Sequence, residues 1–240
     1  MENLTVYKTK FNKTRYGNKH ADGGYIIADL DTSYDAFFSC GISNDITFEL
    51  DFLKKYPIKC FAYDGTVEGL PDRSNSSIKF YKTNISPDNT RSTTNLHAEI
   101  EPFNDIFLKM DIETFEFRWI HSLNEEHLKK IKQMVIEFHF PFTQTGFTHL
   151  DVEISIKDKM SVFEKISRTH KLIHFHPNNC CGTTLYENTI VPNVFECTFL
   201  RKDVDDSTEL NTETIPSSLD VKNVIHNPEI YLNHTPFVNI

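Results

Sequence analysis

Five ionisable side chains lie at or near the ends of two apolar runs in the middle of the chain. They are Asp111, Glu113, Glu116, Glu137 and His139. Carboxylates this close together repel one another, so they require a cation, a shared proton or a basic partner. An imidazole two positions from a carboxylate can act as a general base near neutral pH or bind a metal ion with it. We therefore expect Asp111, Glu137 and His139 to be catalytic, either as a general base or as ligands of Mg or Mn.

Three of these side chains also have a simpler interpretation. Glu113 and Glu116 can begin the next helix and interact favourably with its dipole. His139 can be a structural histidine. Asp111 is the strongest functional candidate, because it follows a short apolar strand, where the sites of α/β proteins concentrate.

A second set of residues has the spacing of a nucleotide site. Gly41 lies in a short turn between the apolar run 36–38 and a segment with helical spacing, and Asp64 follows about 20 residues later. A glycine turn before a helix directs free backbone N–H groups toward a ligand, and Asn44 or Asp45 can cap that helix. An acid at the tip of the neighbouring strand can accept both hydroxyls of a ribose. The alternative is a turn glycine and a loop acid, because the full three-glycine fingerprint is absent.

Alternating strands and helices would position these residues. Apolar and β-rich segments predict seven strands, at 36–38, 58–63, 78–83, 106–110, 133–140, 171–175 and 194–200. Apolar residues at helical spacing predict helices after position 46, at 125–132 and at 151–169. The alternation indicates an α/β fold, a doubly wound, mostly parallel seven-stranded sheet with helices on both faces. We expect the last strand to be antiparallel.

Length and composition predict a single domain over residues 1–240, with an N-terminal cap segment at 1–30 and a C-terminal extension at 203–240. The extension can wrap the domain, cover substrate or form a dimer contact. The double glycine in Asp22-Gly23-Gly24 predicts a tight turn, either in a plain hairpin or across the mouth of the nucleotide crevice. The polar segment 87–101 predicts a loop.

The charge excludes some classes of partner. The net charge is −9, and no run of Lys or Arg supplies a basic face, so we expect neither nucleic-acid nor membrane binding. No apolar run of the length of a membrane span and no leader segment is present, so we expect a cytoplasmic protein. The five cysteines lack C-x-x-C spacing and imply neither a disulfide framework nor a zinc site.

The order of the motifs resembles the class I S-adenosylmethionine-dependent methyltransferases, and among them the FkbM-type O-methyltransferases. The resemblance covers roughly residues 22–200. Its carriers are Asp22-Gly23-Gly24-Tyr25, Gly41-Ile42-Ser43-Asn44-Asp45, Asp64, Leu108-Lys109-Met110-Asp111-Ile112-Glu113 and His176-Pro177-Asn178-Asn179-Cys180. The resemblance implies a Rossmann-like methyltransferase fold with S-adenosylmethionine as cofactor.

The resemblance also assigns roles to residues that match its motifs. The residues implied to contact the cofactor are Gly41 and its loop with Asp45 for the methionine part, Asp64 for the ribose, Asn84 and Ile85 for the adenine, and Gly65 without a specified part. Asp111 would stand between cofactor and acceptor. Ser43 and Asp45 occupy positions where the class often has glycine, and Thr114 replaces the usual glycine after the acid-Ile-acid run, which leaves the role of Glu113 open.

The acceptor side is expected to be polar. His176, Asn178 and Asn179, predicted on a loop after a strand, offer uncharged donors and acceptors that suit a polyhydroxylated acceptor, together with Glu113. The two asparagines can also simply form a turn. Family analogy implies O-methylation of a sugar or glycan hydroxyl, or of another small molecule. The alternatives are a non-catalytic nucleoside-binding or interaction module and, less favoured without phosphate-binding glycines, an NAD-linked oxidoreductase.

Overall fold

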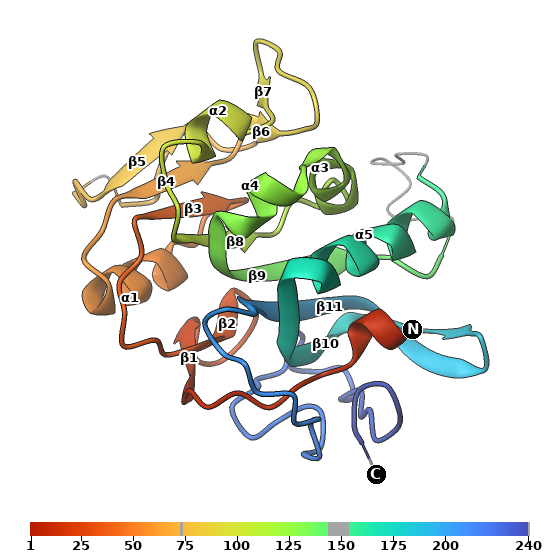
Figure 1. Ribbon diagram of the computed structural model, residues 1–240. Coiled ribbons are helices and arrows are strands. Elements are labelled where there is room, and N and C mark those ends of the chain that lie inside the picture. The colour runs from red at the N-terminus through yellow and green to blue at the C-terminus, as the bar shows by residue number, and fades with distance from the viewer. Residues whose placement is uncertain (73, 144–153, 240) are drawn as a thin grey trace.

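The computed structural model describes residues 1–72, 74–143 and 154–239. Its centre is a seven-stranded sheet in the order β10-β11-β9-β8-β3-β4-β5 (Figure 1). The strands are β3 (Ala36–Cys40), β4 (Cys60–Tyr63), β5 (Ile78–Tyr81), β8 (Ile106–Met110), β9 (Ile131–His139), β10 (His170–Tyr186) and β11 (Thr189–Arg201). Strands β3, β4, β5, β8 and β9 pair in parallel, whereas β11 is antiparallel to both neighbours. The predicted fold class, the seven strands and the antiparallel last strand are confirmed.

The other elements surround this sheet. Two short strand pairs lie outside it, β1 (Lys13–Gly17) with β2 (Gly24–Ala28) and β6 (Asn84–Ile85) with β7 (Thr93–Thr94). The helices are η1 (Glu2–Leu4), α1 (Thr47–Lys55), α2 (His97–Ile100), α3 (Glu116–Ser122), α4 (Glu125–Lys129) and α5 (Ile156–Thr169). The start of the helix predicted at 151–169 falls on residues 151–153, outside the described residues. The helix predicted at 125–132 is shorter, because β9 begins at Ile131.

The chain changes direction at β3. It runs outward from β3 through β4 to β5, then returns to β8 on the other side of β3 and continues outward to β9. Connections that leave adjacent parallel strands in opposite directions open a crevice at the carboxyl ends of those strands. The residues that follow Cys40 and Met110 therefore border a ligand-sized opening.

Aromatic side chains join the layers of the fold. Helices α3, α4 and α5 cover one face of the sheet (Figure 1), where the ring of Phe138 lies 4.7 Å from that of Phe163 in α5. On the opposite face Phe52 of α1 lies 4.8 Å from Phe37 and 4.3 Å from Phe107. The second face is completed by the β1–β2 hairpin, whose Tyr25 and Ile27 join the same core. Helices therefore lie on both faces, as predicted, although a hairpin covers part of one.

Strand β10 is longer than the sequence predicts. The segment His176–Asn179, predicted as a loop, lies inside β10, where His176 pairs with Glu196 and Asn178 with Val194 of β11. Pro177 lies in an edge strand of the sheet, the kind of strand to which prolines are confined in sheets. The prediction of a loop was therefore wrong.

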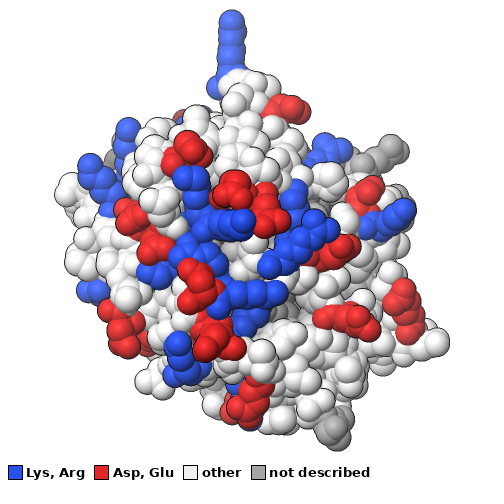
Figure 2. All heavy atoms as spheres, viewed as in Figure 1, with Lys and Arg blue, Asp and Glu red and all other residues white. Residues whose placement is uncertain are grey.

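The C-terminal extension wraps the domain. Figure 1 shows the segment after β11 running beneath β10 and close to the β1–β2 hairpin. Its Phe237 packs on Phe175 at 4.7 Å between ring centroids, and Asn179 bonds to the main chain of Val224 and Asn227. On the face shown in Figure 2, basic and acidic side chains are interspersed. Among the described residues, none of the helices has the length and apolar character needed to cross a membrane.

Candidate functional site

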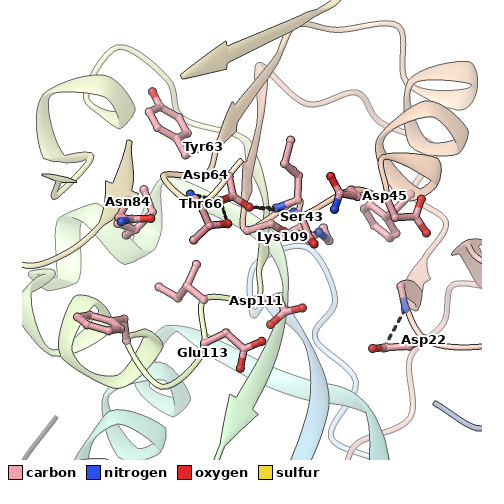
Figure 3. A pocket seen from close by; sticks show the side chains of 18 of the residues that line it. Asp22, Ser43, Asp45, Tyr63, Asp64, Thr66, Asn84, Lys109, Asp111 and Glu113 are labelled. Atoms are coloured by element: carbon pink, nitrogen blue, oxygen red, sulfur yellow. Dashed lines mark hydrogen bonds between the residues drawn. The ribbon is translucent and has the colours of Figure 1, made fainter. Parts of the chain in front are cut away.

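A cavity of about 740 Å³ opens at the carboxyl ends of β3, β4 and β8. Figure 3 shows Tyr63 and Asn84 on one side of it and Asp45 on the other, with Asp111 and Glu113 along a further wall. All six residues predicted to contact the cofactor lie at or beside it, and five line it, namely Gly41, Asp45, Asp64, Asn84 and Ile85. The sixth, Gly65, donates its N–H to the Asn84 side chain over 2.9 Å.

The turn after β3 requires a glycine. Gly41 has φ +80°, and a Cβ there would lie 1.7 Å from the main-chain oxygen of Asp111. The main chain is fixed on both sides, because Gly41 N–H donates to Tyr63 O and Asp111 N–H donates to Cys40 O, each over 2.9 Å. The turn after β3 and the end of β8 thus approach so closely that no side chain fits between them.

Asp64 joins two loops of the cavity. One carboxylate oxygen accepts from the N–H groups of Ile42 (3.1 Å) and Ser43 (2.9 Å), and the other from the N–H (2.7 Å) and hydroxyl (2.6 Å) of Thr66. Burial opposes ionisation, but these hydrogen bonds hold the pKa of Asp64 below its ordinary value. A carboxylate has about four lone-pair sites, so Asp64 organises the cavity wall in addition to any contact with a ribose.

The remaining cofactor candidates also have defined partners. Asp45 accepts from the N–H of Thr47, the first residue of α1, over 2.8 Å, although the N-cap residue itself is Ile46 and makes no side-chain cap bond. At the opposite side of the cavity the ring of Tyr63 stacks on Tyr81, with centroids 4.7 Å apart and planes 6° from parallel. The cavity therefore has a flat aromatic wall next to the amide of Asn84.

The predicted catalytic residues come together at the far end of the cavity. One ligand-type atom each from Asp111, Glu137 and His139 lies within 4.8 Å of the other two. Asp111 lines the cavity, whereas Glu137 and His139 are 3% and 4% exposed and lie behind it. Glu113 also lines the cavity, with its carboxylate 3.5 Å from His139 Nε2. The carboxylate–imidazole cluster predicted from the sequence therefore exists.

Neighbouring side chains hold each member of this cluster. Tyr25 donates its hydroxyl to Asp111 over 3.2 Å, and Asn178 donates to Glu137 over 2.6 Å. Glu116, at the start of α3, lies 3.2 Å from His139 Nδ1. The alternative interpretation of Glu116 as a helix-starting residue is thus correct, and the same carboxylate also contacts the imidazole.

Charge is concentrated at this end of the cavity. Burial raises the pKa of Glu137 well above its ordinary value, and the charge of Asp111 raises it further. Burial alone would lower the pKa of His139, but the carboxylates of Glu116, Glu137 and Asp111 raise it well above its ordinary value. Burial also raises the pKa of Glu113. One imidazole therefore faces several carboxylates in a largely buried site.

The three acceptor candidates on β10 have partners within the protein. His176, Asn178 and Asn179 are 0%, 4% and 4% exposed, and none of them lines the cavity formed by the described residues. His176 Nδ1 lies 3.2 Å from Glu196, while Asn178 holds Glu137. Their predicted role in acceptor binding stays a prediction, and any influence on the acceptor would pass through the groups they hold.

Three further cavity residues have roles that the sequence did not suggest. Lys109, 5% exposed, donates to Gly41 O over 2.8 Å and lies 3.4 Å from Glu49. Thr66 binds Asp64, and Asp22 accepts from Asn223 of the C-terminal extension over 2.9 Å. The sequence did carry a signal for Lys109, namely a lysine inside the otherwise apolar run 106–110. The turn at Asp22 and Gly23 belongs to the β1–β2 hairpin, as the plain interpretation predicts, and it also lines the cavity, while its contact with a ligand stays a prediction.

No protein-family model matches the sequence, and no curated protein matches it. Solved structures that are similar to parts of this chain include the following three. A proposed hemolysin from Streptococcus thermophilus is 13% identical, with 79% of this chain and 65% of that chain covered and a TM-score of 0.38. A proposed S-adenosylmethionine-dependent methyltransferase from Listeria monocytogenes is 9% identical, with 72% of this chain and 93% of that chain covered and a TM-score of 0.41. The fibrillarin pre-rRNA processing protein of Methanococcus jannaschii is 9% identical, with 72% of this chain and 69% of that chain covered and a TM-score of 0.39. This chain spans 65% of the length of the proposed hemolysin.

Proposed function

We propose that the protein is an S-adenosylmethionine-dependent O-methyltransferase whose acceptor is a hydroxyl of a sugar or glycan. The observation that carries the proposal is the cavity at the change of direction of the sheet. It joins a glycine turn, the acid Asp64 and the amide Asn84 to a cluster of proton-binding groups around Asp111. A nucleoside ligand suits the first part of this cavity, and a reacting hydroxyl suits the second.

The cofactor would lie along the cavity. Its adenine would lie by Tyr63, Asn84 and Ile85, and its ribose by Asp64 and Thr66. The methionine part would reach Gly41 and Asp45, which brings the sulfonium toward Asp111. Acidic side chains at that end favour the positive sulfonium over a neutral thioether.

The reaction is a single displacement at the methyl carbon. The acceptor oxygen forms a bond to this carbon while the carbon–sulfur bond breaks, and its electron pair stays on sulfur to give a neutral thioether. The hydroxyl proton leaves to a base or to water. Alignment of oxygen, carbon and sulfur supplies much of the rate. The chain contributes this alignment through the rigid contact between Gly41 and Asp111.

The acceptor would enter beside Asp22, Asp111 and Glu113, which are polar groups on the cavity wall. Hydroxyl groups are suitable donors to these carboxylates. These carboxylates would repel a phosphate group, which disfavours a phosphorylated acceptor. We therefore rank neutral sugars and glycans above nucleotide-sugars.

Isothermal titration calorimetry with S-adenosylhomocysteine in EDTA tests the cofactor assignment. Micromolar binding by the wild type, weakened in Asp64→Asn, is the expected result. Turnover of S-adenosylmethionine on a panel of neutral sugars, glycans and other small molecules then tests the reaction. Binding without turnover on any acceptor would favour a nucleoside-binding module, and failure to bind would remove the methyltransferase assignment.

A further inference from the structure

We propose that Asp111, Glu137 and His139 form a binding site for a divalent cation of the Mn²⁺ type at the inner end of the cavity. The site stands on its own geometry, whereas the catalytic role of the ion rests on the methyl transfer proposed above. This choice separates two roles that the sequence leaves open, a general base and a metal site.

The ligand atoms have the spacing of a metal site. The three side chains each offer one donor atom, and these atoms lie within 4.8 Å of one another. Nε2 of His139 is 3.8 Å from Oδ1 of Asp111, too far for a hydrogen bond between them. A cation between such atoms would contact all of them after small rotations of the side chains. Asp111 directly follows β8, and Glu137 and His139 lie in the neighbouring parallel strand β9, so the sheet fixes their positions.

Each ligand is oriented through its other polar atom. Tyr25 binds Oδ2 of Asp111, Asn178 binds Oε1 of Glu137, and Glu116 binds Nδ1 of His139. This arrangement is typical of metal ligands, whose outer partners set the tautomer and direct the coordinating atom inward. Its result is that Nε2 of His139 is the ring nitrogen on the side of Asp111.

Two buried carboxylate oxygens in or next to this cluster have no hydrogen-bond partner among the described residues. Within the part of the chain that the structure describes, Oδ1 of Asp111 and Oε2 of Glu116 are buried without a hydrogen-bond partner. Glu116 is itself 0% exposed and contacts His139. Buried carboxylate oxygens without partners indicate an ion or water that completes the site. Lys109, which also lines the cavity, is already engaged by Gly41 and Glu49.

The position of the cluster favours an ion over a direct base. Glu137 and His139 lie behind the cavity wall, and only Asp111 of the three lines it. His139 does not line the cavity, whereas an ion held between it and Asp111 would face a hydroxyl in the cavity. A cation there would lower the pKa of the acceptor hydroxyl, whose proton leaves to water.

The donor set indicates which ion to test. Carboxylate oxygens suit Mg²⁺, Ca²⁺ and Mn²⁺, and an imidazole shifts the preference toward transition metals. Mn²⁺ satisfies both kinds of donor and is visible by electron paramagnetic resonance. We therefore use Mn²⁺ as the probe and Mg²⁺ as the competitor.

The test measures Mn²⁺ binding by paramagnetic resonance and calorimetry without any cofactor. The variants are Glu137→Gln and His139→Asn, which remove ligands, and Tyr25→Phe, which removes only an outer partner. Glu196→Gln is the matched control, because Glu196 is 3% exposed on the neighbouring strand but is not a ligand. Binding of S-adenosylhomocysteine in EDTA and the unfolding midpoint establish that each variant is folded.

We expect saturable Mn²⁺ binding by the wild type, at least about tenfold weaker in Glu137→Gln and His139→Asn, about tenfold weaker in Tyr25→Phe, and unchanged in the control. The proposal is overturned if folded wild type binds no Mn²⁺ at millimolar concentration, or if the ligand variants bind it like the wild type. If a ligand variant does not fold, the test relies on Tyr25→Phe, and Mn²⁺ binding by this variant equal to that of the wild type overturns the proposal. Mn²⁺ binding without binding of S-adenosylhomocysteine would refute the methyltransferase and keep the metal site, and the reverse would refute only the metal site.

Discussion

A Cβ on Gly41 would lie 1.7 Å from the main-chain oxygen of Asp111, so the turn after β3 and the residue that follows β8 approach each other without room for a side chain. This contact places the two parts of the proposed reaction in one rigid frame. It also gives a reason for glycine at position 41, although the other glycines of the nucleotide-binding fingerprint are absent from this turn. The need for glycine arises from a neighbouring strand and from φ +80° together.

We expect Gly41→Ala to abolish binding of S-adenosylhomocysteine and to lower the unfolding midpoint strongly. Gly182→Ala is a matched control, because Gly182 has φ +70° but no atom within 4 Å of its added Cβ. The control should lose only about 1–2 kcal/mol of stability, the cost of a left-handed conformation in a residue with a Cβ. Thermal unfolding and calorimetry measure both effects. Equal losses in the two variants would contradict the proposed contact.

We expect Asp64→Asn to weaken binding of S-adenosylhomocysteine by about 1.5–3 kcal/mol, the range for hydrogen bonds to a charged group. An amide nitrogen cannot accept from the N–H groups of Ile42, Ser43 and Thr66, so one set of these bonds is lost. Calorimetry of the folded variant checks this. Asp72→Asn on the exposed loop is the control, and a similar loss there would argue against a specific role for Asp64.

The sequence predicts the sheet well for a physical reason. Strands such as 106–110 are buried on both faces, so they are continuous apolar runs that stand out from their polar surroundings. The strand β10 is harder to predict, because its buried face carries His174, His176 and Asn178 in place of apolar residues. Their partners Asp220 and Glu196 are distant in sequence, and no local pattern reveals such pairs.

In the candidate site, too, residues that follow strands could be predicted, whereas residues that act through tertiary contacts could not. Gly41, Asp64 and Asp111 follow strands directly, so strand order and spacing were enough to bring them to one cavity. Lys109 and Tyr25 act through tertiary contacts, with Lys109 Nζ 5.6 Å above the Tyr25 ring. These contacts depend on how the β1–β2 hairpin folds over the sheet, which the sequence pattern does not specify.

We expect Lys109→Met to destabilise the fold by about 3–5 kcal/mol, the usual cost of leaving one member of a buried ion pair alone. Glu49 is 0% exposed, so its carboxylate would lose the ammonium at 3.4 Å without gaining water. The double variant Lys109→Met with Glu49→Gln should recover part of this loss. Urea unfolding of the single and double variants measures the coupling, and additive losses would show that the two residues do not interact.

We expect His170 to make stability depend on pH. Burial lowers the pKa of His170 to about 4, while an unfolded histidine has a pKa of about 6.5. The unfolded chain therefore binds a proton first as the pH falls. The contribution of His170 is complete above about pH 6.5 and is lost as the pH falls toward about 4, by up to about 1.4 kcal/mol per pH unit.

Urea unfolding between neutral pH and pH 4.5 measures this slope. His170→Gln should flatten it, because glutamine does not titrate and can still donate toward Ile131 O, which His170 Nε2 contacts at 2.7 Å. His20→Gln, at an exposed position, should leave the slope unchanged. An unchanged slope in His170→Gln would assign the pH dependence to other groups.

The way the C-terminal extension packs has a practical consequence for protein production. A shortened version that stops after β11 would look reasonable from the sheet alone. It would remove Leu232 and Phe237, both 0% exposed, and would uncover the apolar surface of Phe175. It would also free the turn at Asp22 that Asn223 holds at the cavity. Expression vectors for this domain should therefore retain residues 203–239, and solubility after trimming is the quickest indicator of how much the extension contributes.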